Sequence, residues 1–411
     1  MNDRRIFYTA AFVRALATGM VGVVLGIYLA ACGLDTTQIG LVIGAGLAGA
    51  GLATAVAMFS GDRIGRKRFL IALALLGALG AVAASIATNA WALALAACFG
   101  MLNGMGRDRG AALALEQAVL PATATDAERT RVLAVYNVML DAGHALGSLL
   151  AGLPVLLRRA AHMSNPDSLR AVLVLYAAMM LATGILYLRL SPAVESSARR
   201  TRVVLSPESR GVLWRICALF SIDGLGGGFL TTALLSFFFF KRFGTNEEVI
   251  GLLFFGARVM NAGSHMAAAW LARRIGLVKT MVFTHVPSSL LLLTVPFAPT
   301  FPIAAALFLL REGLVEMDVP TRQSYVMAVV KPEERTVAST LTALVRLGAW
   351  AVAPSFAGLF MRGTSMAAPL FIGAGLKLTY DVLLYRAFKG RKAPEEMAKS
   401  TVRPAADATR G

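Results

Sequence analysis

The chain has 411 residues, of which 57% are hydrophobic and 15% charged, and its mean hydropathy is +0.67. Together with apolar runs of about 20 residues, this composition excludes an ordinary soluble globular protein and predicts many membrane spans. The formal net charge of +17 does not indicate nucleic-acid binding, because the sequence offers no soluble domain with a basic patch and interleaved aromatic residues.

A hydrocarbon core about 30 Å thick is crossed by roughly 20 helical residues, and this length divides the chain into about twelve segments. In chain order they are Ala10–Cys32, Ile39–Phe59, Leu70–Ala90, Trp91–Val119, Val132–Leu157, Leu169–Leu190, Val212–Phe240, Val249–Leu271, Val278–Ala298, Pro302–Val330, Val337–Met361 and Met366–Phe388. We predict helices for all of them, because lipid offers the backbone no hydrogen-bond partner and the alternation typical of an outer-membrane barrel is absent from the sequence.

Two long stretches repeat one pattern. ERTRVLAVYNVMLDAGHALGSLLAGL begins at Glu128 and ERTVASTLTALVRLGAWAVAPSFAGL at Glu334, an offset of 334 − 128 = 206 that Gln117 and Gln323 also keep. We infer a duplicated six-helix unit. The expected fold is an all-α integral membrane protein of about 12 transmembrane helices in two pseudo-symmetric six-helix bundles, residues 1–190 and 212–390. Residues 191–211, rich in Ser, Arg and Pro, are the expected cytoplasmic linker, and residues 391–411 a cytoplasmic tail.

Basic residues are distributed unevenly between the two faces of this arrangement. With both termini in the cytoplasm, that face collects Arg4, Arg5, Arg63, Arg66, Lys67, Arg68, Arg129, Arg131, Arg199, Arg200, Arg202, Arg210, Arg273, Arg274, Lys279, Lys331, Arg335 and the basic tail. The opposite face has Arg158, Arg159, Arg170, Lys241, Arg242 and Arg362. This asymmetry follows the positive-inside rule. We expect a multi-pass protein of the cell inner (plasma) membrane, surrounded by lipid, with both termini cytoplasmic.

The loop between the second and third segments, DRIGRK from residue 62, carries a family signature. It resembles the pattern G-x-L-A-D-R-x-G-R-K of the major facilitator superfamily, with Met58 in place of the first glycine. The match rests on Asp62, Arg63, Gly65 and Arg66. A glycine allows the tight turn, and arginines lie favourably beside anionic headgroups. The resemblance implies a gating loop that latches the two halves in one state of an alternating-access cycle.

A second pattern bears on the direction of transport. GHALGSLLAG in the fifth segment, with Gly143, Gly147 and Gly152, resembles the G-x-x-x-G-P-x-x-G-G pattern of antiporters in this superfamily. The repeat places AWAVAPSFAG in the eleventh segment, with Pro354 and Gly358. Small residues let helices approach closely, and proline permits bending. The pattern favours export, and ordinary helix packing is the alternative explanation.

Ionisable residues inside the spans are costly in lipid and usually face a partner or a wet cavity. They are concentrated in the fourth and tenth segments, with one or two each in the first, fifth, seventh, eighth and eleventh, whereas the third, sixth and ninth are essentially uncharged at their centres. The resemblance implies that helices 1, 4, 7 and 10 line the cavity and that helices 3, 6, 9 and 12 are peripheral. Lys377 and Asp381 in the twelfth segment depart from this pattern, and their i, i+4 spacing predicts that they neutralise each other.

Two groups of charged residues are the candidate site. Carboxylates in a poorly hydrated cavity can load and release protons, which makes Asp223, Glu316, Asp318 and Asp141 the candidate proton carriers. The arginines that could hold an anionic group of the substrate are Arg107, Arg109, Arg258 and Arg311. Internal ion pairs that support the bundle are the alternative role for each of these residues.

Other kinds of site are not indicated. The three cysteines, Cys32, Cys98 and Cys217, have no framework spacing, so we expect neither structural disulfides nor a metal site. We expect no cofactor and no enzyme activity, because no nucleotide motif has its βαβ context and no catalytic constellation is coherent.

We therefore predict a monomeric secondary transporter that works by alternating access and exports a small organic solute in exchange for protons. A proton-coupled importer of an organic anion is the nearest alternative, because arginines are abundant in the spans. From a different class, a non-transporting membrane sensor or scaffold is the remaining alternative.

Overall fold

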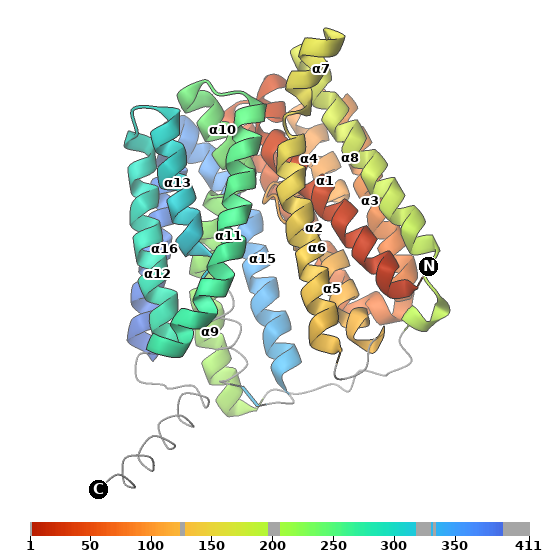
Figure 1. The fold of residues 1–411 in the computed structure, drawn as a ribbon, viewed down its shortest axis with the longest axis vertical. Helices are drawn as coiled ribbons and strands as arrows, with labels where there is room; N and C mark the ends of the chain where they lie inside the picture. The colour runs from red at the N-terminus through yellow and green to blue at the C-terminus, as the bar shows by residue number, and fades with distance from the viewer. Residues whose placement is uncertain (1, 124–127, 196–205, 318–329, 332–333, 389–411) are drawn as a thin grey trace, which may run out of the picture.

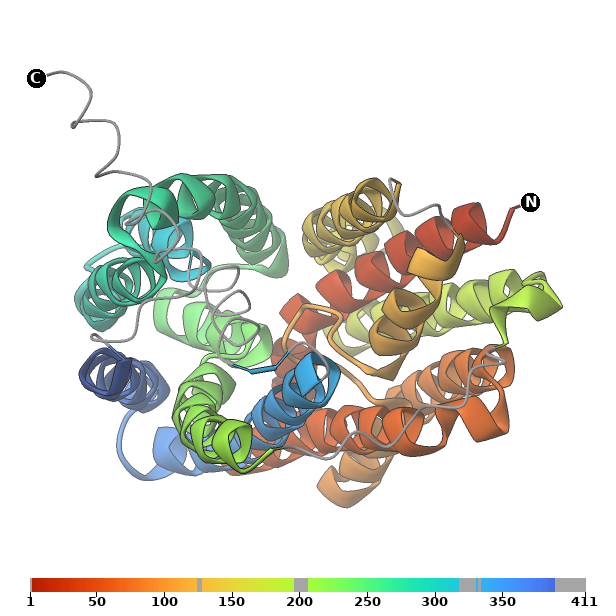
Figure 2. The same ribbon diagram turned by 90° about the horizontal axis from the view of Figure 1, so that it is seen from below.

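The computed structural model describes residues 2–123, 128–195, 206–317, 330–331 and 334–388, except the side chains of residues 62, 122, 130, 265, 266, 269, 273, 277, 278, 336 and 388. Every regular element in these ranges is helical, as predicted. The helices gather in two groups that stand side by side, one from each half of the chain (Figure 1). A view along the helices from below shows the same two groups (Figure 2).

The N-terminal group is built from eight α-helices of the described residues. They are α1 (Asp3–Ala31), α2 (Thr36–Ile64), α3 (Arg66–Ile86), α4 (Ala90–Gly100), α5 (Ala111–Val119), α6 (Arg129–Leu150), α7 (Leu153–Ala161) and α8 (Asn165–Leu188). Short 3₁₀ turns follow α5 at Leu120–Thr123 and α8 at Pro192–Val194.

The described C-terminal helices complete the fold. They are α9 (Pro207–Phe229), α10 (Thr232–Phe243), α11 (Glu247–Ile275), α12 (Leu277–Thr294), α13 (Phe301–Val315), α15 (Arg335–Gly363) and α16 (Ala368–Phe388), with a 3₁₀ turn at Val295–Phe297. Every predicted segment coincides with at least one of these helices. The boundaries of the linker and the tail stay predictions, because residues 196–205 and 389–411 lie outside the described ranges.

The fourth predicted segment is not one continuous helix, and that prediction is wrong. α4 ends at Gly100 and α5 begins at Ala111, with the sequence MLNGMGRDRG between them. In this stretch the side chain of Asn103 accepts from the backbone N–H of Met105 (2.8 Å) and donates to the carbonyl oxygen of Arg107. Such local bonds replace helical ones, and Gly106 adopts φ +65°. We call residues 101–110 the α4–α5 segment.

Length and hydropathy qualify eight stretches of the described chain as membrane spans. The predicted spans that do not qualify are the fourth, eighth, tenth and twelfth, which contain α4 with α5, α11, α13 and α16. These spans are interrupted, or they carry charged residues such as Arg258, Arg311 and Lys377 at their centres. Polar groups at membrane depth are tolerated where they face a cavity or a partner, so we expect these spans to contribute to a polar site.

Glycines at positive φ mark equivalent turns in the two halves. Gly65 separates α2 from α3 with φ +97°, and Gly276 separates α11 from α12 with φ +89°. Residues with a Cβ are strained in this conformation. The shared turn supports the duplication inferred from the sequence.

The two groups meet closely at one face, which we call the distal face and define by Asp35, Arg158, Glu247 and Arg362. Asp35, which caps α2, pairs with Arg362 at the end of α15 at 2.9 Å. Arg158 of α7 pairs with Glu247 of α11 at 2.7 Å. Both ion pairs join the N-terminal group to the C-terminal group. The bundle is therefore closed at the distal face.

Backbones touch where α2 crosses α15 near this face. A Cβ placed on Gly40 would lie 2.2 Å from the carbonyl oxygen of Pro354, and one placed on Gly358 would lie 2.1 Å from that of Thr36. Contacts this short leave no room for a side chain.

We expect Gly358→Leu to prevent closure of the distal face, because the new side chain has no space against α2. Spin labels at residues 34 and 364, which leave the Asp35–Arg362 ion pair intact, should move apart by several ångströms in this variant. Gly348→Leu is the matched control on the same helix, since a Cβ at Gly348 meets nothing within 4 Å. Equal label distances in both variants would contradict the packing role of Gly358.

The opposite face, which we call the linker face, is defined by Gly65, Glu195, Ser206 and Glu334. Glu195 accepts hydrogen bonds from the backbone N–H groups of Arg66 (2.7 Å) and Lys67 (3.2 Å) at the start of α3. The carboxylate of Glu334, before α15, accepts a 2.6 Å bond from the backbone N–H of Ser206, before α9. Carboxylates thus accept hydrogen bonds from backbone N–H groups that lie in the first turn of α3 and directly before α9.

Glu334 gives this face a pH-dependent contribution to stability. Hydrogen bonds from the Ser209 side chain and from Ser206 lower the pKa of its carboxyl. A lowered pKa in the folded state stabilises the fold above the unfolded value of about 4.3, and this contribution is lost as the pH falls through the folded value. We expect Glu334→Gln to lower the unfolding temperature at pH 7 and to have little effect at about pH 3. An equal decrease at both pH values would contradict this explanation.

Candidate functional site

A cavity lies between the two groups, at the level where helices of both are interrupted. Its volume is about 110 Å³, several times the roughly 10–15 Å³ that one water needs. The charged side chains on its wall are Arg107, Arg109, Asp223, Arg258, Arg311, Glu312, Glu316, Arg346 and Lys377, and His285 is also on the wall. Among the described residues, six cations thus face three carboxylates in this cavity.

The four arginines expected to hold substrate all line the cavity, as do Asp223 and Glu316 among the expected proton carriers. Asp141 is exposed on α6 and close enough to act electrostatically on Arg107, but it is not on the cavity wall. Asp318 lies outside the described residues.

The α4–α5 segment reaches across to the C-terminal group. The backbone N–H of Ala233 donates to the carbonyl oxygen of Gly104 (2.9 Å), and the hydroxyl of Thr232 donates to that of Met105 (2.8 Å). Both donors lie at the start of α10, directly after the interruption that separates it from α9. Two broken helices, one from each half, therefore satisfy each other's free backbone groups at membrane depth.

Arg107 extends this contact into an ion pair between the halves. Its guanidinium lies 2.9 Å from the carboxylate of Glu316 and donates to the side chain of Asn261 on α11. Asn261 donates in turn to the carboxylate of Glu312 (2.9 Å). The cation on the N-terminal side is thus held directly by two groups of the C-terminal half, Glu316 and Asn261, and Glu312 in turn holds Asn261.

The ring of Trp350 on α15 contacts one arginine from each half. The guanidinium carbon of Arg109 lies 5.1 Å from the centre of its ring system, and that of Arg346 lies 5.0 Å from it. Both distances are within the range of cation–π attraction. The indole therefore holds two cations against the cavity although it is itself buried.

Arg258 of α11 is held by uncharged groups. Its guanidinium donates to the carbonyl oxygen of Gly106 (3.1 Å) and lies 3.4 Å from the hydroxyl of Thr232. Its Nε is buried and has no hydrogen-bond partner among the described residues. Arg311, by contrast, pairs with the neighbouring Glu312. Among the described contacts, the charge of Arg258 is thus less compensated than that of Arg311.

Asp223 of α9 lies between two cations. Its Oδ1 is 3.0 Å from Nζ of Lys377 on α16, and its Oδ2 is 3.2 Å from the guanidinium of Arg346 on α15. The predicted Lys377–Asp381 pair is therefore wrong: Lys377 bonds Asp223, while Asp381 bonds His285 of α12 at 2.9 Å. Partners distant in the sequence replaced the local one.

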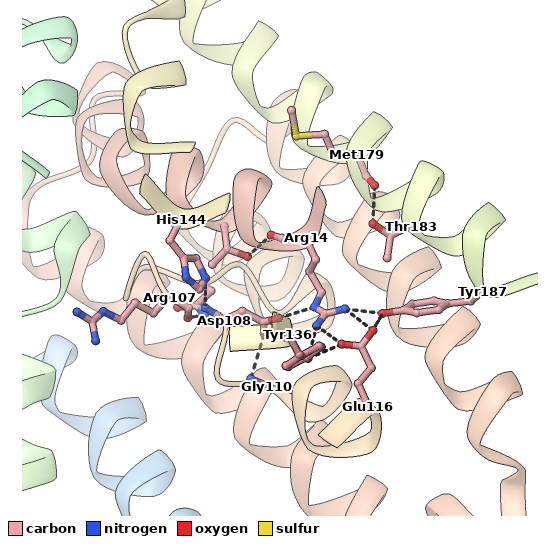
Figure 3. A network of polar contacts seen from close by, with 12 residues as sticks. Arg14, Arg107, Asp108, Gly110, Glu116, Tyr136, His144, Met179, Thr183 and Tyr187 are labelled. Atoms are coloured by element: carbon pink, nitrogen blue, oxygen red, sulfur yellow. Dashed lines mark hydrogen bonds and ion pairs between the residues drawn. The ribbon is translucent and has the colours of Figure 1, made fainter. Parts of the chain in front are cut away.

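A buried network in the N-terminal half supports the α4–α5 segment from behind (Figure 3). Arg14 of α1 bonds both carboxylate oxygens of Glu116 on α5, at 3.1 and 2.6 Å. The hydroxyls of Tyr136 and Tyr187 donate to the same carboxylate, each at 2.6 Å. Arg14 also pairs with Asp108 of the segment. Glu116 is fully buried, so four donors replace its water.

This network orients neighbouring residues in opposite directions. Asp108 points to Arg14, and its backbone N–H donates to Nε2 of His144 on α6 (2.8 Å). Arg107, the preceding residue, points away from the network and toward the C-terminal half (Figure 3). Anchoring Asp108 therefore directs Arg107 into the cavity.

The predicted gating loop lies on the linker face, away from the cavity. Gly65 forms its turn, and the backbone of Arg66 is held by Glu195. Arg63 is exposed near the end of α2, and the side chain of Asp62 lies outside the described residues. The gating role stays a prediction.

The glycines of the predicted packing motif lie at close helix contacts. Cβ atoms placed on Gly143 and Gly147 of α6 would lie 2.6 Å from the carbonyl oxygen of Phe12 and 2.1 Å from that of Leu16, both on α1. One placed on Gly152 would lie 3.3 Å from Glu248. Pro354 and Gly358 lie on α15, at its crossing with α2. These contacts suit helix packing, and the link to export stays a prediction.

The predicted site residues did not include Glu312, Arg346, Trp350, Lys377 and His285, which also line the cavity. Charge within an apolar span is the signal that could have selected the two cations. His285 carries the same signal, because an ionisable histidine is rare within a membrane span, whereas Trp350 carries none.

Comparison with known proteins gives the family and one distant relative. The family model described as Major Facilitator Superfamily matches residues 7–354. A Saccharomyces cerevisiae protein described as uncharacterized membrane protein YJR124C is 24% identical over 423 residues, which cover 95% of this chain and 94% of that protein.

Solved structures share the fold at low sequence identity. The nucleoside transporter NupG has a TM-score of 0.72 at 15% identity, over 95% of this chain and 100% of that one. A bacterial homologue of the human lysosomal transporter Spinster, inward-facing and unoccupied, has a TM-score of 0.67 at 14% identity, over 93% and 94%. The human organic anion transporter MFSD10 has a TM-score of 0.60 at 17% identity, over 93% and 100%.

Proposed function

The chain belongs to the Major Facilitator Superfamily, and from that premise we propose that it is a secondary transporter of a small organic anion. It is a multi-pass membrane protein with the all-helical fold of that family. The proposed substrate binds in the cavity between the halves and is released on either side as the halves rock about it.

The charge of the cavity wall is the observation that carries this proposal. Six cations face three carboxylates there, and the guanidinium of Arg258 bonds only uncharged groups among the described residues. Excess positive charge in a poorly hydrated cavity is costly unless an anion compensates it. Arginine also binds carboxylate and phosphate groups through paired hydrogen bonds. An anionic substrate therefore complements the site better than a neutral one.

Two directions of transport are candidates. The glycine pattern of α6 favours export in exchange for protons, as its resemblance to antiporters implies. The surplus of cations favours uptake of the anion together with protons, because a proton offsets the charge that the anion brings. We place the linker face in the cytoplasm on the basis of the basic residues in the loops, and the protein in the cell inner (plasma) membrane as a monomer.

The experiment that tests this function uses purified protein in liposomes with an imposed pH gradient of either sign. The probes are aryl and alkyl sulfonates, phosphates and dicarboxylates, each paired with its neutral amide or ester. We expect flux of at least one anion and no flux of its neutral analogue. The sign of the pH gradient that accelerates this flux shows whether protons move with the anion or against it. Flux of neutral members alone would contradict an anionic substrate. No flux of any probe would favour the sensor or scaffold.

A further inference from the structure

A polar cluster in the C-terminal half begins on the cavity wall and extends behind it to Asp381. We call it the His285 relay and define it by Asp381, His285, Lys377, Asp223 and Arg346, from α16, α12, α9 and α15. The exposed fraction is 0% for Asp381, 1% for His285, 2% for Asp223 and 8% for Lys377. Burying this many ionisable side chains in a membrane bundle is costly, which makes the cluster a functional candidate.

Hydrogen bonds join the relay into one chain. Nδ1 of His285 lies 2.9 and 3.1 Å from the two carboxylate oxygens of Asp381, and Nε2 lies 3.3 Å from Nζ of Lys377. Nζ also donates to Asp223 at 3.0 Å, and Asp223 pairs with Arg346 at 3.2 Å. All members except Asp381 line the cavity. The chain therefore leads from the cavity to a carboxylate behind its wall.

The donors and acceptors in this chain define the form of the imidazole. With Asp381 ionised, its carboxylate only accepts hydrogen bonds, and Nδ1 of His285 then carries the proton that faces it. An ammonium group only donates, so Nε2 presents its lone pair to Lys377. The imidazole is thus neutral, and the two carboxylates of the relay balance Lys377 and Arg346. The lone pair on Nε2 is the position that remains for a further proton.

A proton on Nε2 cannot coexist with the present position of Lys377, because two N–H groups would then point at each other. The other charged groups that face His285 across the cavity do not remove this conflict. They are Arg311 and Glu312 of α13, which pair with each other, and Arg258 of α11. Tyr380 of α16 packs its ring edge-on against the imidazole at 6.1 Å. Protonation therefore displaces the lysine ammonium from Nε2.

The ammonium has one direction in which to move. Asp381 and His285 lie behind it, and the cavity lies in front of it, where the anion of the proposed function binds. We propose that His285, held by Asp381, is the proton-binding residue of the transporter, and that its protonation releases Lys377 to the bound anion. A hydronium ion that enters the cavity from bulk water transfers one proton to the lone pair of Nε2 and is left as a neutral water molecule, so the relay gains one positive charge. The arriving anion compensates that charge, so proton and anion move together.

This inference rests on the proposed function and assigns the proton to a residue other than the carboxylates predicted from the sequence. Asp223 is the alternative acceptor, but both of its oxygens face cations, which stabilise the ionised carboxylate. The unprotonated form of His285 is stabilised by one cation only, Lys377, and protonation of Nε2 displaces that cation.

The first arm of the test needs no substrate. Full-length protein with ¹⁵N-labelled histidine is titrated in lipid nanodiscs, and the His285 signal is identified by its absence from His285→Gln. We expect a neutral imidazole protonated at Nδ1 that takes up a proton reversibly as the pH is lowered. In Lys377→Met the proton should bind at higher pH, because the displaced ammonium is gone. An imidazole that stays neutral throughout in both proteins would overturn the proposal.

The second arm measures coupling in liposomes that contain a pH-sensitive dye. The probe is the sulfonate or phosphate that the wild-type protein carries fastest. We expect the number of protons moved per anion to fall at least about tenfold in His285→Gln, because the residue that takes up the proton is gone. It should be unchanged in His162→Gln, an exposed histidine between α7 and α8. An unchanged ratio in His285→Gln would overturn the proposal. If no anion is carried, the proposed function fails while the first arm still decides proton binding.

Discussion

Arg14→Leu is expected to destabilise the protein more than any other single change considered for the N-terminal half. The substitution leaves Glu116, which is 0% exposed, with two tyrosine hydroxyls and no cation. Breaking a buried ion pair by removing one partner costs about 3–5 kcal/mol, a large part of the stability of a folded protein. We expect the unfolding temperature to fall by about 5–10 °C.

The measurement uses a thiol-reactive dye during heating, because Cys217 is buried and reacts when α9 unfolds. Arg159→Leu is the matched control. It removes an ion pair with Glu248 whose side chains are 66% and 50% exposed, and such pairs contribute about 0–1 kcal/mol. The double variant Arg14→Leu with Glu116→Leu should recover part of the loss, since no buried carboxylate is then left unpaired. A wild-type unfolding temperature in Arg14→Leu would contradict an ionised Glu116.

The predictability of this structure depends on how far apart the interacting residues lie in the sequence. Hydropathy located a helix in every predicted segment, because a stretch of about 20 residues in lipid must be apolar along its whole length, and this property can be read from the local sequence. The turns at Gly65 and Gly276 could be predicted from local sequence as well. The interruption after Gly100 was missed although the signal was present: Asn103 and three glycines fall within residues 101–110, in a stretch counted as one apolar span.

The partners of the buried charges could not be predicted in this way. Lys377 lies 154 residues from Asp223, and Arg14 lies 102 residues from Glu116. The i, i+4 rule offered Asp381 as the partner of Lys377, but a buried lysine bonds the acceptor that the bundle brings to it. Cavity arginines were predictable because a charge within an apolar span has few other places to face. Their individual roles depend on which carboxylates the tertiary structure supplies.

This difference between arginines leads to the second expected result with a large effect: Arg258→Gln should abolish anion transport. Arg107 and Arg311 each pair with a carboxylate, whereas the hydrogen bonds that Arg258 forms within the described part of the chain go to uncharged groups of Gly106 and Thr232. Its charge is therefore available to the substrate. A hydrogen bond to a charged group contributes about 1.5–3 kcal/mol, so losing two such bonds predicts a decrease in transport of at least about 100-fold.

Uptake or release of the best anionic probe in liposomes measures this decrease, with the unfolding temperature as a check on folding. Arg258→Lys should retain part of the rate, because the charge remains while the paired geometry of the guanidinium is lost. Arg242→Gln is the matched control: Arg242 is exposed at the end of α10, where it lies over the ring of Phe243, and its loss should leave the rate unchanged. If Arg258→Gln folds and transports the anion at the rate of the control, the substrate does not bind this guanidinium. The anion would then have to be held by cations that already bond carboxylates, and transport would require those ion pairs to open.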